Sequence, residues 1–213
     1  MLGSGLACSG LACSGLAFPD LGAIELLAAL AVEHIHPVHG LHPPRDKLAH
    51  AMRCAILTVS TSTAAGDGED ISGPALAEAA TATGAEVVAQ DLLADDRTAI
   101  EAWLRGQVEA GVDLILTTGG TGLTPDDVTP EATIAVIERE VPGLGEAMRA
   151  ASLQYTPMSM LSRALAGTAG RSLIINFPGS PKAITQLFPV VEPVLKHAVA
   201  TLHRENGRRR EKD

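Results

Sequence analysis

The sequence is poor in aromatic and basic residues, and both shortages argue against a nucleic-acid partner. Aromatic residues make up 2% of the 213 residues, which leaves little material for stacking on bases. Lysine and arginine total 16 against 25 acidic residues, and the net charge of −9 is opposite to the basic face of a typical nucleic-acid binder. An acidic chain still binds anionic ligands through local features, namely backbone amides, helix N-termini or a bound metal.

Cysteine and long apolar runs are also scarce. Three cysteines are too few for a disulfide framework, and nothing requires an oxidising compartment. No apolar run reaches the length of a membrane helix, and no basic segment precedes the first charged residue, Asp20, as a secretory signal requires. These absences predict a cytoplasmic protein that does not enter a membrane. The hydrophobic content of 46% is sufficient for one ordinary core.

The first 51 residues are expected to be a low-complexity, flexible extension. The motif Ser-Gly-Leu-Ala-Cys at residues 4–8 recurs at 9–13 and, with phenylalanine last, at 14–18. Met52 stands directly before the first convincing strand, so a dispensable extension and a start assigned too far upstream are both open. Residues 205–213 read as a charged, solvated tail.

A histidine cluster follows an apolar, helix-like stretch at residues 21–32. Its members are His34, His36, His39 and His42. Imidazole is a common metal ligand, so a metal site is one interpretation. The prolines and glycine among these histidines oppose a fixed geometry and favour an irregular segment.

From residue 53 onward, strand and helix patterns alternate. Strand-like runs occupy 55–60, 86–90, 114–118 and 173–177. Helical patterns occupy 74–83, the stretch that follows Asp95-Asp96 and ends at Gly111, a segment that Thr129 is expected to cap, and a segment that begins at Pro181. Pro189 and Pro193 are expected to break or kink the last helix. The alternation predicts an α/β domain with a mostly parallel sheet covered by helices on both faces. Ligands bind beyond the carboxyl ends of such strands.

The strongest functional pattern follows the strand at 114–118. Gly119-Gly120-Thr121-Gly122 can turn sharply and present amide groups at close range, and Thr118, Thr121 and Thr124 add hydroxyl donors. The pattern is neither a P-loop nor a dinucleotide fingerprint, because the spacing of its glycines differs and no Gly-Lys-Ser/Thr follows. We interpret the loop as a site for phosphate or carboxylate.

Three further segments lie past strand ends. Asp95 and Asp127 are candidate metal-linked carboxylates, although a helix cap or a turn explains each as well. Pro178-Gly179-Ser180 follows the strand at 173–177 and precedes Lys182. A cation in the first turn of a helix is disfavoured by the helix dipole, so Lys182 indicates an anionic partner. Ser72, at the end of the loop after the first strand, is another candidate for ligand contact.

Together these residues resemble the molybdopterin adenylyltransferase family, which includes the bacterial Mog and MoaB proteins and the G domains of the plant cofactor-insertion protein and gephyrin. The most specific match is the Gly-Gly-Thr-Gly block followed by Asp127-Val128-Thr129-Pro130-Glu131-Ala132-Thr133. The resemblance covers about residues 53–204 in the family's order. The other matching stretches are 55–60, 72–74, 141–144, 160–164 and 173–181.

The resemblance implies a three-layer α/β/α fold over residues 52–204, usually assembled as a homotrimer. It implies transfer of AMP from ATP with Mg²⁺ to molybdopterin, with release of pyrophosphate, and a hand-over of product to a molybdenum insertase. Asp127 and Asp95 match the family's two essential aspartates, with Asp95 as a metal ligand. The remaining matches to substrate-binding positions are Thr118, Gly119, Gly120, Thr121, Gly122, Thr124, Ser72, Pro178, Gly179 and Ser180.

Two positions depart from the family pattern. Relatives often carry Asp or Asn where this chain has Thr61, and a basic residue where it has Asp126. Two alternative functions stay open. One is a non-catalytic pterin-binding or scaffold module, and the other is a nucleotide pyrophosphatase of the CinA type, which shares the fold.

Overall fold

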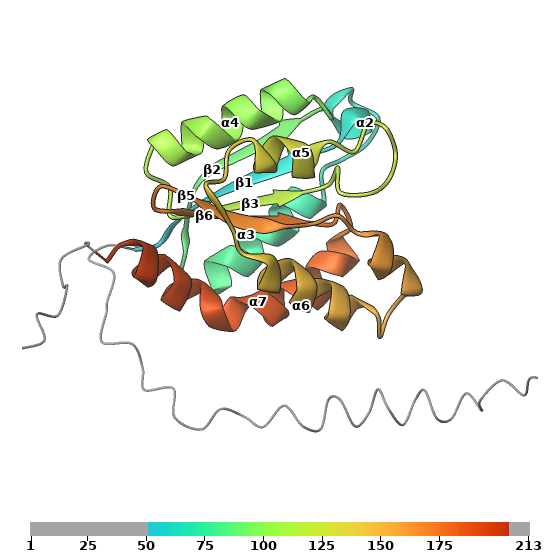
Figure 1. Ribbon diagram of the computed structural model, residues 1–213. Helices are drawn as coiled ribbons and strands as arrows, with labels where there is room; N and C mark the ends of the chain where they lie inside the picture. Colours follow the sequence, from blue (N-terminus) through green and yellow to red (C-terminus); the bar gives the residue numbers. More distant parts are fainter. Residues whose placement is uncertain (1–50, 205–213) are drawn as a thin grey trace, which may run out of the picture. The chain divides into compact units, whose positions relative to one another are not determined.

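The computed structural model describes residues 51–204 (Figure 1). The repeats at 4–18, the helix-like stretch at 21–32, the histidine cluster and the charged tail all lie outside the described residues. The domain boundary predicted near residue 52 therefore stays a prediction. Among the helices between residues 51 and 204, none combines the length and the apolar character that crossing a bilayer requires.

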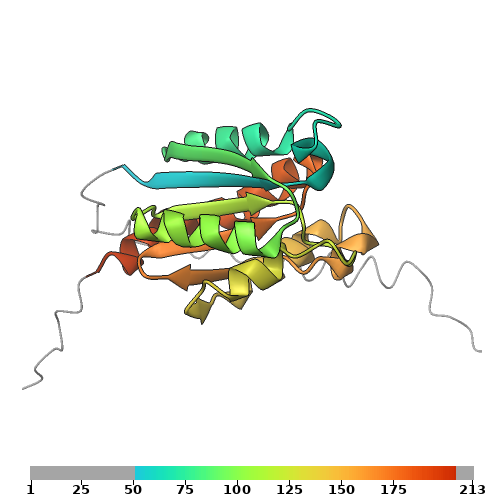
Figure 2. The same ribbon diagram turned by 90° about the horizontal axis from the view of Figure 1, so that it is seen from above.

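Six strands form one sheet in the order β2-β1-β3-β6-β5-β4 within the described range. Four of them are parallel: β1 (Arg53–Val59), β2 (Glu86–Leu93), β3 (Leu114–Thr118) and β6 (Ser172–Phe177). The edge is antiparallel, because β5 (Ala166–Ala169) runs against β6 and β4 (Arg139–Glu140) runs against β5. The mostly parallel sheet is confirmed, and Figure 2 shows the strands side by side.

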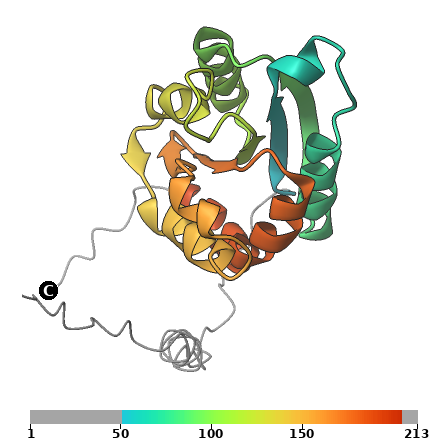
Figure 3. The same cartoon turned by 90° about the vertical axis from the view of Figure 1, so that its right-hand side faces the viewer.

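Helices cover both faces of the sheet, which confirms the three-layer α/β/α fold (Figures 1 and 3). Alternate residues of each strand point to opposite faces. Ile56 and Leu116 belong to a core shared with α3 (Ser72–Ala82), α6 (Pro142–Ser152) and α7 (Pro181–Leu202). Leu57 and Ile115 belong to a second core shared with α4 (Arg97–Glu109) and α5 (Thr129–Ile134). All four of these strand side chains are fully buried, as expected for a sheet covered on both sides.

The sequence of helix α4 explains where the helix begins, which side is buried and where it ends. Asp96 caps it, because its Oδ1 accepts hydrogen bonds from the Thr98 amide at 2.8 Å and the Ala99 amide at 3.0 Å. Ile100 and Leu104, four residues apart, are fully buried, and the helix ends before Gly111. The predicted helix after Asp95-Asp96 is confirmed, and Asp96 is the one of the two that caps it.

The last helix corrects a prediction. Helix α7 continues through Pro189 and Pro193, so the break that the sequence suggested at these prolines does not occur. Both prolines lie on its exposed side, so the carbonyl groups that lose an amide partner can bind water. The opposite side is buried along the whole helix, and this packing compensates for the backbone hydrogen bonds that the two prolines cannot donate. The buried residues are Ile184, Leu187, Phe188, Val191, Leu195, Val199 and Ala200.

Three other local predictions differ from the structure. Thr129 does not cap α5: Val128 takes the cap position, and Thr129 is the first helical residue with a fully buried side chain. Strand β2 runs on to Leu93, beyond the end predicted at residue 90. The loop after β1 contains a short helix, α2 (Thr61–Ala64), capped by Ser60.

The strand order fixes where a ligand can bind. From β1 the chain passes to β2 on one side of it, and then returns to β3 on the other side. Loops that leave β1 and β3 therefore diverge and open a crevice at the carboxyl ends of these strands. Figure 3 views the domain from this end.

Candidate functional site

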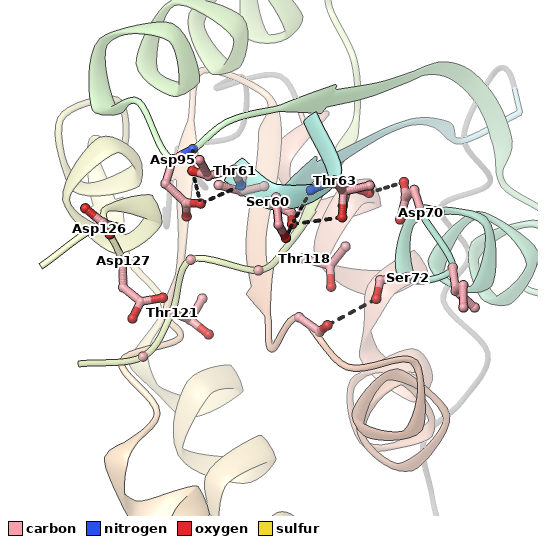
Figure 4. A pocket seen from close by; sticks show the side chains of 18 of the residues that line it. Ser60, Thr61, Thr63, Asp70, Ser72, Asp95, Thr118, Thr121, Asp126 and Asp127 are labelled. Carbon is pink, nitrogen blue, oxygen red and sulfur yellow. Dashed lines mark hydrogen bonds between the residues drawn. The ribbon is translucent and has the colours of Figure 1, made fainter. Parts of the chain in front are cut away.

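A cavity of about 590 Å³ occupies the crevice (Figure 4). Its walls come from four strand ends, since segments after β1, β2, β3 and β6 all contribute. All the predicted site residues line it except Pro178 and Ser180. The predicted residues that line the cavity are Ser72, Asp95, Thr118, Gly119, Gly120, Thr121, Gly122, Thr124, Asp127 and Gly179. Their roles toward a ligand remain predictions.

The glycine loop, residues Gly119–Gly122, packs closely against β1 and α5. Gly119 has φ of 101° and lies so close to β1 that a Cβ there would stand 2.1 Å from the Val59 carbonyl oxygen. Gly120 has φ of 61°, and a Cβ there would stand 2.3 Å from Thr129 Oγ1. Only glycine fits both positions without strain. The amides of Gly120 and Thr121 donate to no acceptor within residues 51–204, so they are available to an anion.

Asp127 is held by Thr124 within the loop. Its Oδ2 accepts hydrogen bonds from the Thr124 amide at 2.8 Å and the Thr124 hydroxyl at 2.6 Å. Partial burial raises the pKa of Asp127. The hydrogen bonds from the Thr124 hydroxyl and from the Thr124 and Gly122 amides, together with the charge of Arg163, outweigh burial and lower that pKa below its ordinary value. Asp127 is therefore a carboxylate at neutral pH.

Asp95 is held by Thr61, from the end of the neighbouring strand. Asp95 Oδ2 accepts from the Thr61 amide at 2.9 Å and from the Thr61 hydroxyl at 2.8 Å. Within residues 51–204, every hydrogen bond to this carboxylate ends on Oδ2, so Oδ1 is left for another partner. The helix-cap explanation belongs to Asp96 and not to Asp95.

Several predicted hydroxyl donors are engaged by the protein itself. Thr118 Oγ1 donates to the Pro178 carbonyl oxygen at 2.8 Å, and Ser72 Oγ donates to the Gly179 carbonyl oxygen at 3.2 Å. These bonds join the ends of β3 and β6 to the start of α3. Thr118 and Ser72 therefore shape the cavity wall in this structure.

Two residues of the predicted Pro178-Gly179-Ser180 segment lie elsewhere. Ser180 takes the cap position of α7, its side chain makes no capping hydrogen bond, and it lines neither this cavity nor the next. Pro178 lines a second cavity of about 380 Å³. That cavity is mostly apolar, with Met148, Met158 and Leu161 in its wall, and it meets the first at Thr121 and Gly122.

The structure identifies Arg163 as a residue whose importance the sequence did not show. Its side chain donates to the carbonyl oxygens of Gly122 at 2.6 Å and Asp127 at 2.5 Å, and it pairs with Glu131. The sequence marked it only as part of the matching stretch at 160–164. Its distance along the chain, 36 residues from Asp127, hides the contact.

The donor set suits a magnesium ion that is shared with phosphates. Within residues 51–204 no cluster of three or more His, Cys, Asp or Glu side chains could hold a metal by itself. Mg²⁺ is commonly bound through one or two carboxylates, substrate phosphates and water, without a full protein cage. Asp95 and Asp127, which line one cavity, fit that arrangement.

The fold and the site together define a class of protein: an α/β domain with an anion-binding glycine loop and two carboxylates at a topological switch point. Residues 55–197 match the family model described as "Probable molybdopterin binding domain". The match spans more than half of the chain, so the chain belongs to this family.

Known proteins agree with this assignment. The chain is 40% identical over 147 residues to the molybdopterin adenylyltransferase of Helicobacter pylori, covering 68% of this chain and 84% of that protein. It is 37% identical over 158 residues to molybdenum cofactor biosynthesis protein B of Bacillus cereus, covering 72% and 92%. Among solved structures, the molybdopterin biosynthesis enzyme MoaB from Thermus thermophilus matches with a TM-score of 0.68 and 46% identity, covering 71% of this chain and 96% of that chain.

Proposed function

We propose that this protein is a molybdopterin adenylyltransferase in molybdenum cofactor biosynthesis, which transfers AMP from ATP to the terminal phosphate of molybdopterin. The observation that carries the proposal is that one cavity contains both the free amides of Gly120 and Thr121 and two carboxylates, those of Asp95 and Asp127. Amides bind phosphate oxygens, and carboxylates bind the metal that accompanies ATP. The 40% identity to a named molybdopterin adenylyltransferase supports the same reaction.

The reaction depends more on positioning the two phosphate groups than on proton transfer. A phosphate monoester has a second pKa of about 6, so the molybdopterin phosphate is already largely a dianion at neutral pH. One of its oxygens attacks the α-phosphorus of ATP, the bond to the β-phosphate oxygen breaks, and pyrophosphate leaves. The main obstacle is the repulsion between two polyanions, which amide donors and cations relieve.

Each acidic residue then has a defined task. Asp95, through its open Oδ1, and Asp127, kept ionised by Thr124, would hold Mg²⁺ against the phosphates. Mg²⁺, when bound, supplies charge neutralisation on the phosphate oxygens. Neither aspartate acts as a general base. Asp126, exposed on the cavity rim, adds a negative charge that works against phosphate binding.

The wider proposal follows the family. We propose a cytoplasmic homotrimer that passes adenylylated molybdopterin to a molybdenum insertase. Residues 52–204 form the catalytic domain, with 1–51 as an extension and 205–213 as a charged tail. The exposed apolar side chains after α6 are surface that a neighbouring protomer can cover. They are Leu153, Tyr155, Met158, Met160 and Leu161.

The test is pyrophosphate release from ATP by the full chain, with and without molybdopterin and with and without Mg²⁺. We expect release that needs both. Asp127→Asn is expected to lower turnover by about 100-fold or more, as loss of one electrostatic partner does in other enzymes. The adjacent Asp126→Asn serves as the matched control, and it should keep or increase turnover.

Three outcomes separate the alternatives. Release without molybdopterin would indicate a pyrophosphatase and contradict the transferase. Tight molybdopterin binding without release would indicate a binding or scaffold module. Full turnover in Asp127→Asn with unchanged Mg²⁺ dependence would refute the assigned role of Asp127.

A further inference from the structure

Arg163 makes hydrogen bonds to four residues between Thr121 and Glu131, and two of these residues belong to the glycine loop. Its amide donates to the Thr121 carbonyl oxygen at 3.0 Å. Its side chain donates to the carbonyl oxygens of Gly122 at 2.6 Å and Asp127 at 2.5 Å, and to the Glu131 carboxylate. One residue thus holds the last two residues of the glycine loop, the backbone of Asp127, and Glu131 in the helix that follows.

These contacts orient the peptide groups of the loop. In a trans peptide the carbonyl and the amide hydrogen point in opposite directions. With the Thr121 carbonyl held by Arg163, the Gly122 amide of the same peptide points away from Arg163. That amide is one of the hydrogen-bond donors to the Asp127 carboxylate, whose Oδ2 lies against Gly122. Arg163 therefore acts on the Asp127 carboxylate through the peptide between them, as well as directly through the Asp127 carbonyl.

Arginine is suited to this task, and lysine is not. A planar guanidinium offers five donors in a fixed fork, whereas an ammonium is a compact point charge. Nε and the two terminal nitrogens of Arg163 each have a different acceptor, spread over residues 122–131. The side chain is about one-third exposed, so its charge alone is partly screened by solvent. The ammonium group of a lysine could not reach these three acceptors at the same time.

We propose that Arg163 is a positioning residue for the transfer reaction, which fixes the glycine loop and the Asp127 carboxylate in the geometry that the metal and phosphates require. This inference rests on the proposed function for its kinetic consequence. Its structural consequence, the fixed direction of the Gly122 amide, stands independently of any activity.

The kinetic test compares Arg163→Lys and Arg163→Gln with the wild type in the full chain. We expect kcat to fall by about 100-fold in both, as a displacement of about 1 Å produces, because lysine keeps the charge but not the fork. The KM for ATP should change by less than about threefold, since the amides that bind phosphate belong to other residues.

Arg105 provides the matched control. Its guanidinium also pairs with a glutamate, Glu101 at 2.8 Å, and donates to a carbonyl, that of Ala135 at 2.5 Å, but it lies on α4 outside the cavity. Arg105→Gln should leave kcat within about twofold of the wild type. If Arg163→Lys turns over as fast as the wild type, the positioning role is refuted.

Hydrogen exchange of the Gly122 amide separates this inference from the proposed function. In Arg163→Gln that amide should exchange at least about tenfold faster than in the wild type, while β3 amides keep their protection. If the wild type releases no pyrophosphate, the proposed transferase fails and the exchange experiment alone decides the role of Arg163. Unchanged Gly122 exchange would overturn the positioning role. Should Arg163→Gln fail to fold, Glu131→Ala, which removes one of the acceptors, replaces it with the same expectations.

Discussion

Thr61 and Asp95 are joined by three hydrogen bonds. The Thr61 amide and hydroxyl both donate to Asp95 Oδ2, at 2.9 and 2.8 Å, and the same hydroxyl oxygen accepts the Asp95 amide at 3.0 Å. The pair ties the end of β1 to the end of β2 at the cavity wall. A position that departs from the family pattern is therefore the one that orients a proposed metal ligand.

Replacing Thr61 tests that relationship. Thr61→Val keeps the side-chain shape and removes both hydroxyl bonds, so Asp95 should lose its fixed orientation and kcat should fall by about tenfold. Thr61→Ser keeps the hydroxyl and should stay close to the wild type. Pyrophosphate release is the measurement. Equal turnover in Thr61→Val and Thr61→Ser would show that the hydroxyl does not matter.

A methyl group at Gly120 should disrupt the loop. Gly120 has φ of 61°, and an added Cβ would lie 2.3 Å from Thr129 Oγ1 and 2.9 Å from Asp95 Oδ1. Gly120→Ala is expected to lower the free energy of unfolding by about 1–3 kcal/mol and to abolish most turnover.

The matched control is Gly106→Ala, in the interior of α4 with open space around the new methyl group. It should raise the free energy of unfolding by about 0.5–1 kcal/mol, because alanine is the better helix former. Urea unfolding followed by the fluorescence of Trp103, the single tryptophan, measures both variants. A stabilised Gly120→Ala would contradict the described loop conformation.

A buried polar network under α5 should contribute strongly to stability. Asn176 Nδ2 donates to Thr117 Oγ1 at 2.9 Å and to Thr133 Oγ1 at 3.0 Å, and all three side chains are fully buried. Asn176→Leu leaves buried hydroxyls without their partner and should lower the free energy of unfolding by about 2–3 kcal/mol. Thr168→Val is the control, since the buried Thr168 hydroxyl has no partner within residues 51–204 and its loss should change stability by less than about 0.5 kcal/mol.

The lowered pKa of Asp127 predicts a pH dependence of stability. A carboxyl group whose pKa is lower in the folded state than its ordinary 3.8 stabilises the fold above pH 3.8, and loses that contribution as pH falls through the folded value. The difference in free energy of unfolding between the wild type and Asp127→Asn should be constant near neutral pH and shrink in acid. Parallel curves from about pH 6 down to about pH 2 would contradict the assignment.

Much of the fold follows from local sequence. Leu57, Ile115 and Ile174 lie in runs apolar enough to identify strands buried on both faces, and Asp96 and Gly111 mark the ends of a helix. The antiparallel edge was not predictable in this way. Strand β4 has two exposed residues and β5 reads Ala-Gly-Thr-Ala, so neither carries a strand pattern, and only pairing with β6 makes them strands.

The site was predictable where it depends on strand ends and not where it depends on distant contacts. Sequence order alone placed Asp95, Gly120 and Asp127 past parallel strands, which meet at one edge of the sheet. The role of Arg163 depends on a fold that returns the chain to the loop, and no local pattern encodes that. Likewise, the continuity of α7 through Pro189 depends on which side of the helix the core covers.

The strand order also bears on how the protein is made. Strand β6 lies between β3 and β5 in the sheet, yet among the strands of residues 51–204 it is the last to be synthesised. A nascent chain that has emerged only as far as β5 would expose the open edge of β3 and would lack Gly179 from the cavity wall. The cavity is therefore completed only after the chain has been synthesised as far as Gly179. A chain that stops before residue 172 contains the whole glycine loop but lacks β6 and Gly179, so its site is incomplete.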